Sequence, residues 1–295
     1  MKQSITTKIL IHTFFVLVCL TFIIPFMYVI SLSITSDDVL QSTGYALIPK
    51  KIDFAGYTTL FRNPTQILNS YKVTIAFTVI GTLLAMIIMT LAAYPLSKST
   101  FKYKKQISFY MYFTMLFSGG LIPSYIINTR YLNLGNNFWV YVLPALVSAY
   151  YIIILRTFFS NIPSSLLEAA RIDGAKEYTI FWRIILPLSK PVLATVALFE
   201  VLGRWNNWNT SLYYIRDSEL FSLQYLLQKI LRESEFLEKM SENTNLLITI
   251  GGSEEAPVES MRFAMAIVAA GPMLVIFPFF QKYFTKGLTV GSVKG

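Results

Sequence analysis

The chain has 295 residues, of which 54% are hydrophobic and only 14% charged, and its formal net charge is +9. This composition excludes an ordinary soluble domain of this length, since such domains carry about 25% charged residues. The basic residues flank apolar runs and form no stripe that would suit nucleic acid, so membrane topology explains the charge better. Cys19 is the only cysteine and His12 the only histidine, so we expect neither a disulfide framework nor a metal site.

Six apolar runs are long enough to cross a hydrocarbon core of roughly 30 Å as helices. We expect the spans at about 9–33, 71–96, 107–127, 138–158, 192–213 and 261–284. The first run exceeds the apolar region of a typical secretory signal and lacks a small-residue cleavage site, so it should be retained. Gly119, Gly120 and Pro123 predict a break near the outer end of the third span. The predicted fold class is an all-α integral membrane protein with one domain, residues 1–295.

The loop between the fourth and fifth spans, residues 159–191, is a polar island. Ser164 and Ser165 can cap a helix that starts near residue 166, and Gly174 suits a left-handed turn at its end. A second helix should follow from about 176 to 185, closed by Pro187 and Pro191. The loop is therefore predicted to be a helix, a sharp turn and a second helix outside the bilayer. An ordinary amphipathic connector between two spans is the simpler alternative.

The end of the fifth span is the least lipid-like part of any span. Glu200 and Arg204 are four residues apart and can pair on one helix face, which lowers the cost of burying either charge. Aromatic rings beside amide groups suit a sugar, because its C–H faces pack on the rings while its hydroxyls bond to the amides. Membrane interfaces also collect tryptophan, and the ion pair can serve packing alone. The candidate residues for a substrate path are Glu200, Arg204, Trp205, Asn206, Trp208 and Asn209.

Weaker candidates are aromatic residues inside the third and fourth spans, where packing or lipid contact is the usual role: Tyr110, Tyr112, Tyr150 and Tyr151. After the fifth span, residues 214–260 form an acidic segment that we expect to be an external loop, as we do for residues 36–70. Lysine and arginine collect on the side of the 159–191 loop, which should therefore be cytoplasmic. Six spans then place both termini in the cytoplasm, with the protein in the plasma membrane.

The loop resembles a known signature. Importers of the ATP-binding cassette (ABC) class carry a cytoplasmic loop in each membrane subunit that reads Glu-Ala-Ala, three residues, Gly, nine residues, then Ile-x-Leu-Pro. The matching positions here are Glu168, Ala169, Ala170, Gly174, Ile184, Leu186 and Pro187. In that family the first short helix docks on the ATPase subunit and carries its motion into the membrane. The residues that this resemblance assigns to the ATPase contact are Glu168, Ala169, Ala170, Asp173, Gly174, Leu186 and Pro187.

The order of features also resembles the maltose-type, oligosaccharide-importing branch of these permeases, and within it the smaller-subunit group. Similar runs are 119–123, 171–175, 205–208 and the tail 287–295. In that group the tail reaches between the ATPase subunits, which would give contact roles to Gly291, Lys294 and Gly295. A disordered end is the alternative for a tail of this composition.

The resemblance implies a second, homologous permease subunit, two ATPase subunits, an external solute-binding protein and a saccharide substrate. ATP and Mg would be bound by the ATPase subunits and no cofactor by this chain, which has no phosphate loop of the Gly-x-x-x-x-Gly-Lys-Ser/Thr type. The chain would be a transport subunit without catalytic residues. Other possibilities are a permease for a peptide, polyamine or inorganic ion, a secondary carrier, and, with least support, an intramembrane hydrolase.

Overall fold

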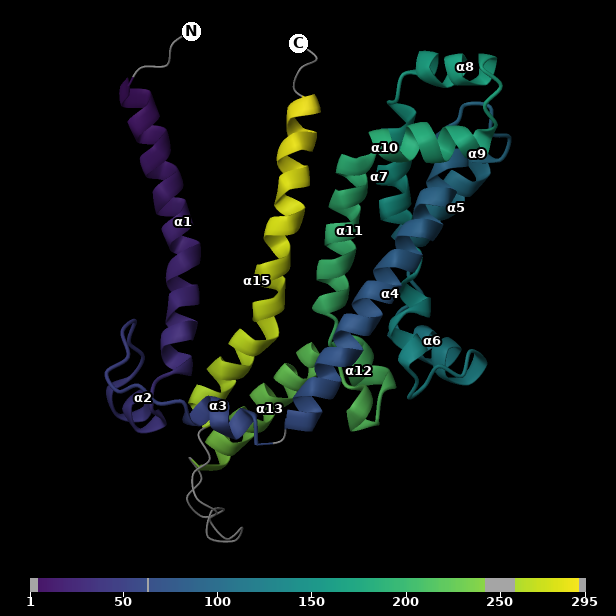
Figure 1. The fold of residues 1–295 in the computed structure, drawn as a ribbon. Coiled ribbons are helices and arrows are strands. Elements are labelled where there is room, and N and C mark those ends of the chain that lie inside the picture. The colour runs from purple at the N-terminus through teal and green to yellow at the C-terminus, as the bar shows by residue number, and fades with distance from the viewer. Residues whose placement is uncertain (1–4, 63, 242–257, 292–295) are drawn as a thin grey trace. The chain divides into compact units, whose positions relative to one another are not determined.

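The computed structural model describes residues 5–62, 64–241 and 258–291 (Figure 1). Within these ranges the regular structure is helical, apart from a single bridge of extended backbone between Thr35 and Ile52. The predicted all-α class is confirmed. The chain falls into two compact units, Met1–Ile67 with Leu226–Pro272, and Leu68–Tyr225 with Met273–Gly295. The expectation of a single domain over 1–295 stays a prediction.

The first unit is built on α1 (Ile5–Ser33), whose side chains are exposed along most of its length. Two short helices, α2 (Asp37–Thr43) and α3 (Ala55–Leu60), lie in the segment expected to be an external loop. The Ser33 and Tyr57 hydroxyls lie 3.0 Å apart, which joins the end of α1 to α3. The Ser260 amide donates to Asp37 at 2.9 Å, so the start of α15 (Val258–Gly291) is held at α2.

Among the described residues, three helical segments are long and apolar enough to cross a membrane by themselves: α1, α4 (Pro64–Ser97) and Glu259–Phe279 within α15. They correspond to the first, second and sixth predicted spans. The number rises to six if each of three bent helix pairs is one span. Two of these pairs show that the third and fourth predicted spans are interrupted helices rather than continuous ones. The third pair, Glu177–Leu188 with Lys190–Trp205 (77°), instead joins the end of the 159–191 loop to the start of the fifth predicted span.

The interruptions of the third and fourth spans lie at defined residues. α5 (Lys104–Leu116) and the following α6 (Leu121–Ile126) with η1 (Ile127–Tyr131) are bent by 110°, at the Gly119-Gly120 pair where a break was expected. The fourth span begins as two 3-10 segments, η2 (Phe138–Tyr141) and η3 (Leu143–Ala145). It continues, with a bend of 46°, as α7 (Ala149–Ser160).

The fifth predicted span, 192–213, contains two helices, α11 (Lys190–Trp205) and α12 (Asn209–Tyr214). The acidic segment 214–260 is not a simple loop, because it contains η5 (Ser218–Leu220) and the 19-residue helix α13 (Leu223–Ser241). Leu223, Leu226 and Ile230 share one face of α13 and are buried. This helical spacing was present in the sequence. Residues 242–257 lie outside the described part of the chain.

A network of buried hydroxyl groups fixes the end of the second unit that holds η2, α12 and the start of α13. The Tyr141 and Ser211 hydroxyls lie 2.6 Å apart, and Ser211 donates to Ser222 at 2.9 Å. The Leu223 amide donates to Thr74 of α4 at 2.9 Å. The Tyr141 ring stacks on Phe77 of α4 with centroids 4.6 Å apart. Each buried polar group of this network thus has a partner, as burial requires.

Candidate functional site

The polar loop between the fourth and fifth spans forms a helix, a turn and a second helix, as predicted. The first helix is α8 (Ser164–Ile172). It starts two residues earlier than expected, and its N-cap is Pro163 with no side-chain cap, so Ser164 and Ser165 lie inside the helix rather than capping it. α8 lies with the following helices at the Ser97 end of α4 (Figure 1).

The turn after α8 is a Schellman motif built on Gly174. The Ala175 amide donates to the Ala170 carbonyl at 2.9 Å, and the Gly174 amide donates to the Arg171 carbonyl at 3.0 Å. Gly174 has a φ of 80°, a left-handed conformation that glycine adopts without the steric cost of a Cβ. The turn satisfies carbonyls at the end of α8 and reverses the chain sharply. Asp173 precedes it and is exposed.

The second helix continues past the point where it was expected to end. It consists of α9 (Glu177–Ile180), the π-helical η4 (Phe181–Ile185) and α10 (Leu186–Leu188). In the π-helical turn the Leu186 amide donates to the Phe181 carbonyl, and this wider spacing lets the helix pass the missing N–H of Pro187. Pro187 therefore does not close the helix. Pro191 lies in the first turn of α11, a position that proline suits.

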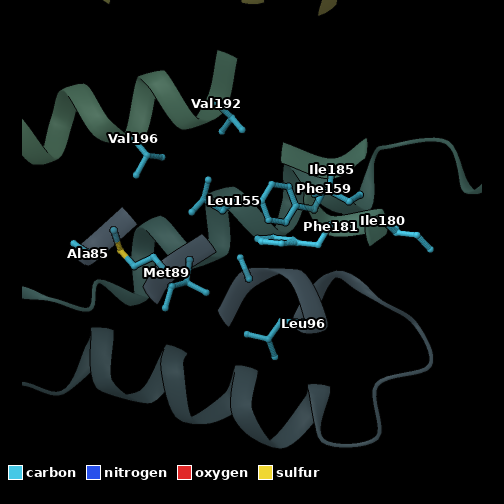
Figure 2. Close-up of a cluster of buried hydrophobic side chains, with 12 residues drawn as sticks. Ala85, Met89, Leu96, Leu155, Phe159, Ile180, Phe181, Ile185, Val192 and Val196 are labelled. Carbon is cyan, nitrogen blue, oxygen red and sulfur yellow. The ribbon is translucent and has the colours of Figure 1, made fainter. Parts of the chain in front are cut away.

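A hydrophobic cluster ties the loop to the spans. It draws buried side chains from α4, α7, α9, η4 and α11, and Figure 2 shows Phe159, Phe181 and Ile185 side by side within it. Its buried members are Ala85, Met89, Ala93, Leu96, Ile152, Leu155, Phe159, Ile180, Phe181, Ile185, Val192 and Val196. Close-packed interiors of this kind have low compressibility and transmit displacement. The second helix of the loop thus shares one packed core with helices of three spans, α4, α7 and α11.

α8 has an inner and an outer face. Leu167 and Ala170 are half-buried and pack against the cluster. Glu168, Ala169 and Ile172 are exposed, and 86% of the Ile172 surface is open. These three residues form the outer face of the helix. The sequence motif thus divides between the two faces, with Glu168 and Ala169 outside and Ala170 inside. Leu186, farther along the loop, is half-buried against the same cluster.

A second point of attachment was not predicted from the sequence. The Glu177 carboxylate accepts hydrogen bonds from Lys98, from the Tyr94 hydroxyl at 2.7 Å and from Arg171 Nε at 3.3 Å. We call these four residues the Glu177 cluster. The Lys98 hydrogen bond is the largest cause that lowers the pKa of Glu177 below its usual range; burial acts in the opposite direction. Glu177 falls between motif positions, so the motif gave no signal for it.

The predicted pair of Glu200 and Arg204 forms, with Arg204 Nε 3.0 Å from the carboxylate and both side chains buried. The guanidinium also donates to the Ala145 carbonyl at 2.5 Å and to the Tyr141 carbonyl at 3.5 Å. These carbonyls belong to the interrupted start of the fourth span. Arg204 therefore donates hydrogen bonds to backbone carbonyls that would accept from amides of the same helix if the helix were regular. This geometry favours the packing role for the pair.

The six candidates for a substrate path do not share one surface. Trp205 is buried with Glu200 and Arg204, whereas Asn206 and Asn209 are exposed and Trp208 is half-buried. Asn206 donates to the Leu202 carbonyl at 3.0 Å, which caps the end of α11. A role in the path stays a prediction for all six. Of the tail residues, Gly291 ends α15, and Lys294 and Gly295 lie outside the described residues.

The described helices are apolar and long enough to cross a membrane alone or as bent pairs, which places the chain in the class of integral membrane proteins. The comparison with known families agrees with this class. A family model described as "Binding-protein-dependent transport system inner membrane component" matches residues 73–290. The chain belongs to this family. Its members are permease subunits, a class without an ATPase site of its own.

Individual relatives cover nearly the whole chain. The polygalacturonan/rhamnogalacturonan transport system permease protein YtcP of Bacillus subtilis (strain 168) is 37% identical over 97% of both chains. The arabinooligosaccharides transport system permease protein AraQ of the same organism is 29% identical over 98% of this chain and 96% of its own. A solved structure of a bacterial ABC transporter involved in the import of the acidic polysaccharide alginate matches with a TM-score of 0.77 and 30% identity. It covers 96% of this chain and 99% of that one.

Proposed function

We propose that this chain forms half of the translocation path of an ATP-driven importer for an oligosaccharide, and that α8 is the contact through which a cytosolic ATPase acts on it. The observation that carries the proposal is the division of α8 into two faces. Its inner face packs on a cluster shared with α4, α7 and α11, while Glu168, Ala169 and Ile172 stay exposed. A push on the outer face therefore reaches three spans through packed side chains.

The assembly that fits this role has a second permease subunit, two ATPase subunits that bind ATP and Mg, and an external solute-binding protein. Both termini and the 159–191 loop lie on the cytoplasmic side, in keeping with the lysine and arginine distribution. ATP-driven closure of the ATPases would displace α8 and turn the path outward to receive the sugar. Trp208, Asn206 and Asn209 are the residues we propose for sugar contact, because they offer ring and amide groups that are not fully buried.

The names of the relatives support a saccharide. They refer to polygalacturonan or rhamnogalacturonan, to arabino-oligosaccharides and to alginate. All of these are polymers or oligomers of sugars, and they include both acidic and neutral ones. An oligosaccharide is their common chemistry, so short galacturonate oligomers are a suitable first probe.

Copurification tests the contact. The chain carries an affinity tag, is expressed with its partner permease and ATPases, and is compared with Glu168→Lys and with Glu233→Lys as a control. Glu233 is also exposed but lies on α13. We expect the wild type and the control to retain the ATPases and Glu168→Lys to lose them together with uptake. Full uptake by Glu168→Lys, at normal membrane abundance, would show that α8 is not the contact with the ATPase.

A further inference from the structure

The Glu177 cluster joins α8 and α9, which are neighbours in the chain, to the distant end of α4. Tyr94 lies in the last turn of α4, and Lys98 directly follows that helix. Arg171 lies in the last turn of α8, and Glu177 begins α9. One carboxylate receives all three donors. Lys98 Nζ also lies 4.3 Å from the centroid of the Tyr94 ring, and that ring contacts Phe181 at 5.1 Å between centroids. The cluster is therefore continuous with the hydrophobic cluster beneath it.

α8 has little other attachment to the rest of the chain. Its described residues include none that is fully buried, and its apolar attachment consists of the half-buried Leu167 and Ala170. Apolar contacts are not directional, so they alone would let a short helix shift across the surface beneath it. Hydrogen bonds to a carboxylate from charged donors are directional and stronger than neutral ones. The Arg171 bond thus fixes where the end of α8 lies relative to α4.

We propose that Glu177 is a positioning residue that holds α8 to the Ser97 end of α4, so that displacement of α8 moves α4 with it. This inference rests on the proposed function, in which the ATPase displaces α8. α4 is the element that a displacement should reach, because it contributes Ala85, Met89, Ala93 and Leu96 to the core. Farther along, its Gly81 lies against the Arg204 guanidinium, which holds the interrupted fourth span.

The first measurement is hydrogen exchange of the α8 amides in the purified complex in lipid nanodiscs. Glu177→Gln keeps the side-chain volume and removes the charge, and folding should survive because the carboxylate is half exposed (54%). We expect α8 to exchange at least about threefold faster in this variant, since exposed ion pairs are individually weak, with α7 unchanged. Glu233→Gln is the matched control, because it removes an exposed carboxylate that pairs with Lys229 at 3.7 Å.

The second measurement separates positioning from simple structural support. ATP hydrolysis of the same complexes is stimulated with solute-binding protein loaded with galacturonate oligomers. Glu177→Gln should lower the stimulated kcat by at least about fivefold, because coupling between two sites usually changes a property by about fivefold or more. The KM for ATP should stay unchanged. Lys98→Gln should cause a similar loss, and the double variant no more than either single one, because both act through one contact. Tyr94→Phe, which keeps both ion pairs, should lie between wild type and Glu177→Gln.

Each remaining outcome overturns the proposal. If α8 exchange and kcat are both unchanged, Glu177 positions nothing. If exchange is faster but kcat is unchanged, the contact is structural support without a part in coupling. If kcat falls while exchange is unchanged, or the losses of Lys98→Gln and Glu177→Gln add, the effect does not pass through this contact. If the wild-type chain does not copurify with ATPases, or if its ATP hydrolysis is not stimulated, the proposed transport function is wrong. Hydrogen exchange of α8 in Glu177→Gln would then still show whether Glu177 positions α8.

Discussion

Replacement of Gly81 by alanine tests the packing of Arg204 directly. A Cβ at Gly81 would lie 2.8 Å from Arg204 Cζ, closer than real Cβ contacts come, so the guanidinium must shift. The shift weakens its 2.5 Å hydrogen bond to the Ala145 carbonyl and its pairing with Glu200. Overpacking costs about 1–3 kcal/mol, and alanine in a helix returns about 0.5–1 kcal/mol, so the net loss should be about 0–2.5 kcal/mol.

Gly203 provides the matched control on α11, since a Cβ there meets no heavy atom within 4 Å. Gly203→Ala should therefore gain about 0.5–1 kcal/mol from helix propensity alone. At about 2–4 °C per kcal/mol, Tm should fall by up to about 10 °C in Gly81→Ala and rise by about 1–4 °C in Gly203→Ala, so that the two variants differ by about 2–12 °C. Fluorescence-detected size exclusion after heating, at one heating rate for all samples, measures both. Gly81→Ala with the same Tm as Gly203→Ala would refute the close approach.

Three further predictions concern the loops and the tail. Because the pKa of Glu177 is lowered, its contribution to stability is present above the ordinary glutamate pKa and lost as pH falls through the lowered one. The Tm difference between wild type and Glu177→Gln should thus hold from about pH 8 to 5 and shrink only on stronger acidification; a constant difference down to about pH 2 would contradict this. Cysteine at position 253, in a Cys19→Ser background, should react with an impermeant thiol reagent in intact cells, and labelling only in broken cells would reverse the topology. Deletion of Val290–Gly295 should reduce sugar-stimulated ATP hydrolysis without removing the protein from the membrane, whereas full stimulation would make the tail a simple end.

Elements with a strong local signal were predictable from the sequence. The long apolar runs of α1, α4 and α15 fixed their class and their approximate bounds. Gly174 and the Gly119-Gly120 pair marked a turn and a break, because glycine reaches conformations that other residues avoid. The pairing of Glu200 with Arg204 followed from a spacing of four residues on a helix.

Features that depend on distant segments were not predictable. The Glu177 cluster brings Tyr94 and Lys98 to a carboxylate about 80 residues away, a separation that no local spacing encodes. The carbonyls bonded to Arg204 belong to a span that looked continuous, because apolar composition does not distinguish a regular helix from an interrupted one. Helix α13 is a different case, since its apolar spacing was visible and its many charges led us to expect a loop.

The make-up of the hydrophobic cluster also sets an order of events during synthesis. Ala85 of α4 and Val196 of α11 are both members, and roughly 110 residues separate them. At about 5–20 residues per second, that interval takes about 5–20 s. When Ile180 and Phe181 emerge, the cluster members of α4 and α7 have already been made, whereas Val192 and Val196 of α11 have not. A nascent chain stalled before residue 192 should therefore leave the α11 side of the cluster uncovered, an apolar surface that chaperones and proteases recognise.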